Sequence, residues 1–96
     1  MTSYRLSKLA EDDIRRLYRY GIETFGPQQA DIYFDALFEQ FDKIARSPTI
    51  YQSADDILPG YRRCVFAAHT IYYRMDENVT LIMRILGREN PVLSGL

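Results

Sequence analysis

The chain has 96 residues, 47% of them hydrophobic and 26% charged, and its formal net charge is −1. These values are typical of a single globular domain with one core, and they exclude a largely disordered chain. No apolar run approaches the roughly 20 residues of a membrane span, charged residues interrupt residues 1–13, and Cys64 is the one cysteine. We therefore expect a cytoplasmic protein with no membrane partner and no internal disulfide.

The amino-terminal third predicts an amphipathic helix. After a short extended segment at residues 4–6, Ser7 can cap a helix whose first turns carry acidic side chains near the positive end of the helix dipole. Apolar residues then recur at intervals of three and four as far as Phe25. Gly26 can take the left-handed conformation that ends a helix.

A second helix is expected directly after the first. Pro27 suits the first turn of a helix, and the apolar face that follows is broader than that of the first helix. Ser47 and Pro48 end the pattern, and residues 49–60 read as a connecting loop with one helical turn at most. We therefore predict a helical hairpin.

The second half of the chain predicts a sheet. Residues 61–67, 70–75 and 79–86 are rich in aromatic and β-branched side chains and are separated by tight breaks, as in an antiparallel meander. The tail, 87–96, has no period and is expected to be extended or loosely ordered. The predicted fold class is α+β, an N-terminal helical hairpin packed on a three- to four-stranded antiparallel sheet, in one domain over 1–96.

Arginine dominates the basic side chains. Lysine occurs only at Lys8 and Lys43, so ten of the twelve basic residues are arginine, which suits bidentate contacts with carboxylates and phosphates. Residues 57–96 carry five arginines against three acidic residues, which indicates an anionic partner. For the helix arginines the simpler interpretation is a solvated face.

The alternation of strand side chains predicts a mixed outer face on the sheet. If the purely apolar sets of the last two strands meet the helices, the opposite face combines rings, aliphatic side chains and arginines. Such a face can be a docking surface, because interface centres favour tyrosine and arginine. The alternative is a solvated face stiffened by cross-strand pairs. The expected outer set is Thr70, Tyr72, Arg74, Ile82, Arg84 and Leu86.

Signals for catalysis are weak. His69, the one histidine, and Cys64 do not make a zinc site or a cysteine–histidine nucleophile, and His69 is expected to be structural. There is no glycine-rich phosphate loop and no G-x-S-x-G motif. The carboxylate pair Asp12 and Asp13 is explained by helix capping and solvation. We therefore expect no enzyme, no catalytic residue, no metal and no cofactor.

Several short motifs, in this order and spacing, resemble the ParE toxins of the RelE/ParE group of toxin–antitoxin systems. They cover nearly the whole chain, and they are Leu9 to Ile14, Gly26-Pro27, Tyr61-Arg62-Arg63, His69 to Arg74, and Arg84 to Arg88. The resemblance implies the toxin component of a type II system, which inhibits DNA gyrase and is neutralised by a ParD-like antitoxin in a hetero-oligomer. It implies no sequence-specific binding of nucleic acid.

The resemblance also implies site residues. The antitoxin would contact Tyr72, Arg74, Ile82, Arg84 and Leu86. The target-binding residues would be Arg84 and the segment Gly87, Arg88, Glu89, Asn90 and Pro91, which matches the family's exposed carboxy-terminal motif.

Two alternatives stay open. The RelE-type relatives are ribosome-dependent mRNA endoribonucleases, but this chain has Thr70 where they carry an arginine, no lysine after Lys43 and no tyrosine after Tyr73. A nuclease would lack its acid–base groups, so gyrase inhibition is favoured. The other alternative is a non-toxic module that only binds an antitoxin.

Overall fold

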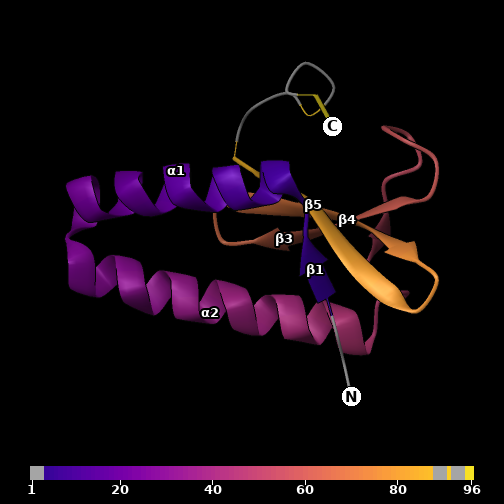
Figure 1. Ribbon diagram of the computed structural model, residues 1–96, viewed down its shortest axis with the longest axis horizontal. Coiled ribbons are helices and arrows are strands. Elements are labelled where there is room, and N and C mark those ends of the chain that lie inside the picture. Colours follow the sequence, from indigo (N-terminus) through magenta and orange to yellow (C-terminus); the bar gives the residue numbers. More distant parts are fainter. Residues whose placement is uncertain (1–3, 88–90, 92–94) are drawn as a thin grey trace.

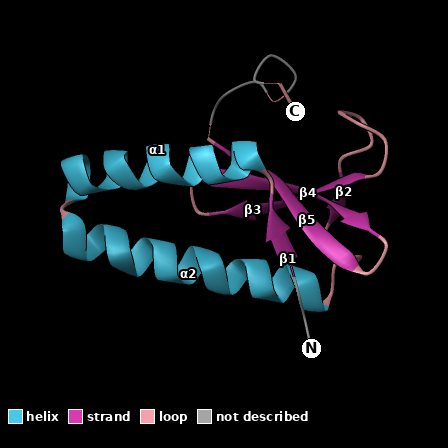
Figure 2. Cartoon of the chain, in the orientation of Figure 1, coloured by secondary structure: helices cyan, strands magenta, loops and turns pink. Residues whose placement is uncertain are grey.

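The two predicted helices lie side by side and cover one face of the sheet (Figure 1). The computed structural model describes residues 4–87, 91, 95 and 96. Figure 2 shows the helix connection extending to the left of the strands, which lie towards the right of the molecule. The elements are β1 (Tyr4–Leu6), α1 (Lys8–Phe25), α2 (Pro27–Arg46), β2 (Gln52–Ser53), β3 (Tyr61–Phe66), β4 (His69–Asp76) and β5 (Val79–Leu86).

Local signals set the helix boundaries as predicted. The Ser7 hydroxyl accepts a hydrogen bond of 3.0 Å from the backbone N–H of Ala10, which satisfies one of the donors left over at a helix start. Gly26, with a φ of 91°, ends α1, and its N–H donates to the Ile22 carbonyl. The predicted helical hairpin is confirmed.

The sheet is larger than predicted. The meander of β3, β4 and β5 forms, but the strand order is β1-β5-β4-β3-β2, and β1 runs parallel to β5 with Leu6 opposite Ile82. The α+β class is therefore confirmed, whereas the sheet is five-stranded and mixed rather than three- to four-stranded and antiparallel. The sequence shows residues 4–6 as extended, but their partner strand is more than 70 positions away, and local patterns carry no information about it.

A bulge in β5 changes which side chains face the helices. Tyr72 pairs with Arg84 but Tyr73 pairs with Ile82, so Met83 is an extra residue in β5. Alternation resumes one residue later, and both Ile82 and Ile85 reach the core beneath the helices. The prediction that Ile82 lies on the outer face is therefore wrong.

The main core lies between the helices and the sheet. Its fully buried side chains come from both helices and from β4 and β5, and the largest are Leu37, Phe41, Ile44, Ile71, Tyr73, Ile82 and Ile85. A smaller cluster of Ala54, Tyr72 and Leu86 lies away from it, with Ile57, Tyr61 and Leu96 packed against it. Within the described part of the chain, neither helix is long and apolar enough to cross a bilayer.

Candidate functional site

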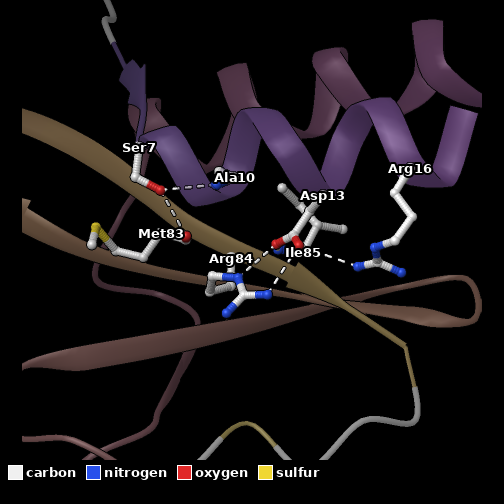
Figure 3. Close-up of polar contacts among 7 residues, drawn as sticks. All are labelled: Ser7, Ala10, Asp13, Arg16, Met83, Arg84 and Ile85. Carbon is white, nitrogen blue, oxygen red and sulfur yellow. Dashed lines mark hydrogen bonds and ion pairs between the residues drawn. The ribbon is translucent and has the colours of Figure 1, made fainter. Parts of the chain in front are cut away.

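A buried ion pair joins the first helix to the last strand. Arg84 donates from Nε to Asp13 Oδ2 at 2.8 Å and from Nη2 to Asp13 Oδ1 at 3.0 Å (Figure 3). The two side chains are only 10% and 4% exposed. Arg16 makes a further contact with Asp13 Oδ1 at 3.2 Å. Such a two-point contact holds a guanidinium in one orientation.

The interpretation of Asp13 as a solvated or capping acid is wrong. Asp12 does lie on the exposed face, where it contacts Lys8 and Arg15. Asp13 is buried instead. A signal was present in the sequence, because Asp13 follows Ala10 by three positions and precedes Leu17 by four, which places it on the apolar stripe.

The predicted antitoxin contacts do not form one exposed surface. Tyr72 and Leu86 are buried in the smaller cluster, at 7% and 1% exposure, and Ile82 is buried under the helices. Arg84 is occupied by Asp13. Arg74 is half-buried, the most exposed of the five, and lies opposite Tyr61 on β3.

Parts of the predicted target-binding segment are described. Gly87 directly follows β5 and is half-buried, and the carbonyl of Pro91 accepts a hydrogen bond of 3.0 Å from the N–H of Leu96. The predicted residues Arg88, Glu89 and Asn90 lie outside the described residues.

An apolar groove, which sequence reasoning did not identify, opens between the hairpin and the β3–β4 turn. Its volume is about 530 Å³. At its rim, Tyr20 and Phe25 are 60% and 66% exposed. These are large apolar side chains near the helix connection, and Figure 1 shows that end of the hairpin extending past the sheet. The lining residues are Leu17, Tyr20, Gly21, Phe25, Gln29, Ala30, Tyr33, Phe34, Ala67, Ala68, His69 and Gly87.

A tyrosine and the histidine form one wall of this groove. Tyr33 Oη and His69 Nδ1 are 2.6 Å apart, and the ring of Tyr33 packs edge-on against Phe66. Burial raises the pKa of Tyr33, so its phenol stays protonated at neutral pH. His69 is therefore held at the start of β4 by a side chain of α2.

The described residues offer little metal-binding chemistry. No three His, Cys, Asp or Glu side chains among residues 4–87, 91, 95 and 96 are grouped to hold a metal ion. Cys64 is buried, and burial raises the pKa of its thiol, which disfavours the thiolate that a metal or an electrophile would need.

The same architecture occurs in toxin–antitoxin assemblies. A solved chain from the chromosomal ParDE system of P. aeruginosa matches this fold with a TM-score of 0.80 over 93% of this chain and 98% of that chain, at 20% sequence identity. Because the sequence identity is only 20%, this match shows a shared fold and nothing more. The fold of this chain is therefore also found in a toxin–antitoxin system.

Sequence comparison gives the family. Residues 4–91 match the model of the ParE toxin of the type II toxin-antitoxin system, parDE. The chain is 33% identical to Toxin ParE1 of Caulobacter vibrioides over 82 residues, which cover 85% of each chain. It is 31% identical to Toxin ParE1 of Mycobacterium tuberculosis over 90 residues, which cover 93% of this chain and 92% of that protein. This chain therefore belongs to the family of ParE toxins of parDE type II toxin–antitoxin systems, and the predicted family is confirmed.

Proposed function

We propose that this ParE-family toxin stops growth by binding DNA gyrase and is neutralised by a ParD-like antitoxin that occupies the apolar groove. Family membership gives the class of toxin, and the target and the partner are what we add to it. The observation that carries the antitoxin part is the groove itself, since Tyr20 and Phe25 expose apolar surface beside a concave site. Large exposed apolar patches of this kind mark protein interaction sites.

The groove suits an amphipathic antitoxin segment. Its lining is largely apolar and comes mostly from the two helices, so a partner helix can place residues spaced three and four apart into it. Arg74, on the sheet, adds a cationic contact for an acidic side chain of the same partner. Tyr72 and Leu86 support that part of the sheet, while Ile82 acts only through the core.

We place gyrase binding at the end of β5, on Arg84, Gly87 and Pro91 together with the predicted residues 88–90. The action is by binding rather than by catalysis. Side chains that a nuclease would use for acid–base work are in structural contacts: Tyr73 donates to the Pro48 carbonyl, and Arg63 binds Ser53 and Asp56. These contacts engage the Tyr73 hydroxyl and the Arg63 guanidinium within the fold, which does not favour a role in acid–base catalysis.

A bacterial expression experiment tests the target. The chain is induced alone in a host with a DNA-damage reporter, and the purified chain is added to a gyrase supercoiling assay. Growth arrest with a damage signal and loss of supercoiling supports gyrase as the target. Growth arrest with cleaved mRNA, but with no damage signal and no loss of supercoiling, would show the RelE-type activity in place of gyrase inhibition. A chain that binds antitoxin and causes no arrest would be a binding module.

Antitoxin affinity tests the groove. Tyr20→Glu and Phe25→Glu should each weaken binding of the ParD-like antitoxin about tenfold or more, because a buried aromatic anchor contributes roughly 2 kcal/mol or more. Ile50→Glu is the matched control, since Ile50 is 72% exposed and does not line the groove. If both groove variants bind like the control, the antitoxin lies elsewhere.

A further inference from the structure

The first turns of α1 complete the edge of β5 where its partner strand stops. β1 ends at Leu6, which pairs with Ile82. Beyond that point the N–H of Ser7 donates to the Ile82 carbonyl at 2.9 Å, and the Ser7 hydroxyl donates to the Met83 carbonyl at 2.8 Å. Figure 3 shows Ser7 and Asp13 both directed at this strand edge.

Asp13 supplies the next hydrogen-bond acceptor along this edge. Its Oδ2 accepts a hydrogen bond of 3.0 Å from the backbone N–H of Ile85 as well as the bond from Arg84 Nε. One carboxylate therefore sets both the backbone of β5 and the guanidinium of Arg84, and the contact lies two residues before Gly87. A buried amide without this acceptor would be left without a hydrogen bond at this edge, which proteins rarely tolerate.

The orientation of Arg84 follows from the same contact. Because Nε and Nη2 both bind Asp13, the guanidinium approaches the carboxylate side-on and has little rotational freedom. Its third nitrogen is turned away from α1 (Figure 3). A lysine at this position would keep the positive charge but lose the two-point contact.

We propose that Asp13 is a positioning residue for toxicity: it sets the place and orientation of Arg84 and of the end of β5, from which the target is bound. This inference depends on the proposed placement of target binding at Arg84 and Gly87, but not on gyrase being the target. Asp13 itself need not touch the target, since it is buried and fully occupied by Arg84, Arg16 and Ile85.

Three variants separate positioning from general stability. Asp13→Asn keeps the shape and an oxygen acceptor for the Ile85 amide but loses the charge that holds Arg84. Arg84→Lys keeps the charge of the strand residue but loses the two-point geometry. Asp12→Asn is the matched control, because Asp12 is the adjacent carboxylate in exposed ion pairs. The melting temperature of each variant shows how much of any change in potency comes from lost stability.

The main measurement is growth-arrest potency against the amount of toxin in the cell, which does not depend on the identity of the target. Asp13→Asn and Arg84→Lys should each lose tenfold or more in potency, with antitoxin affinity unchanged within about threefold. In NMR spectra of the free chain, amide shifts should change at Ile85 to Gly87 and stay in place across β3. Asp12→Asn should match the wild type in every measurement.

Three results would overturn the inference. One is full potency of Asp13→Asn with altered shifts at Ile85. Another is a loss of potency that tracks antitoxin affinity and melting temperature. The third is a wild-type chain that does not arrest growth. Arrest by the wild type without inhibition of gyrase, in contrast, would refute only the proposed target.

Discussion

The hydroxyl of Tyr73 donates a hydrogen bond of 2.6 Å to the carbonyl oxygen of Pro48, which joins the central strand β4 to the segment after α2. Tyr73 is fully buried, and its ring packs edge-on against Tyr51. Pro48 lies just past the end of α2, so this bond determines how the chain leaves the helix and returns to the sheet. Tyr73 therefore has a structural role in this fold.

Tyr73→Phe should lower the free energy of unfolding by about 1–3 kcal/mol, because the Pro48 carbonyl loses its buried donor. The exposed Tyr20→Phe is the control and should be neutral within about 0.5 kcal/mol. Urea denaturation at neutral pH measures both. Equal stabilities of the two variants would show that water replaces the lost bond without cost.

Stability should also fall at alkaline pH, in part through Tyr73. Burial raises the pKa of its phenol far above the ordinary value of about 10, so the folded chain keeps the proton that the unfolded chain loses. The stabilisation is complete below pH of about 10 and is lost as the pH rises towards the folded pKa. Urea midpoints from pH 8 to 11 should fall less steeply in Tyr73→Phe, where Tyr4 and Tyr33 still contribute. Parallel curves would contradict this assignment.

Acid should weaken the loop before β3 through Asp55. Its carboxylate accepts a 2.7 Å hydrogen bond from the Gly60 N–H, and this bond holds the pKa of Asp55 below its ordinary value. Because this pKa is lower in the folded chain, the ionised carboxylate stabilises the fold at every pH above the unfolded pKa of about 4. This stabilisation is lost as the pH falls through the folded pKa. Asp55→Asn should therefore reduce the difference in melting temperature between pH 6 and pH 3. An unchanged difference would rule out Asp55 as its source.

Two glycines of the hairpin should respond to alanine with opposite signs. In Gly21 a new Cβ would lie 3.5 Å from that of Ala30, an ordinary contact inside a helix, so Gly21→Ala should stabilise by about 0.5–1 kcal/mol. Gly26 has a φ of 91°, which an alanine adopts only under strain, so Gly26→Ala should destabilise by about 1–2 kcal/mol. Melting temperatures of the two variants check both signs. A destabilising Gly21→Ala would mean that the helices cannot adjust to the added methyl group.

Ile82 should behave as a core residue and not as a surface contact. Ile82→Ala should lower the free energy of unfolding by about 2–5 kcal/mol, since the side chain is 0% exposed beneath the helices. Ile50→Ala, at a residue 72% exposed, should change it by less than about 0.5 kcal/mol. Chemical denaturation distinguishes the two. A stable Ile82→Ala variant that binds the antitoxin weakly would instead show that Ile82 contacts the antitoxin.

Much of the fold follows from short-range physics in the sequence. The Ser7 cap, the Gly26-Pro27 break and the change from helical to alternating periodicity each act within a few residues, and the structure places the helices and the three long strands where these signals predict them. The family can also be recognised from the sequence, because its short motifs are local and occur in a set order along nearly the whole chain.

The candidate sites depended on contacts that no local signal encodes. The Asp13–Arg84 pair joins residues 71 positions apart, and β1 finds its partner strand over a similar distance. The extra residue Met83 shifts the alternation of β5 and moves Ile82 into the core. Strand register, edge completion and the groove arise only when the helices are packed on the sheet. The sequence alone therefore determined the elements and the family, while tertiary packing decided which side chains are buried and which remain available to a partner.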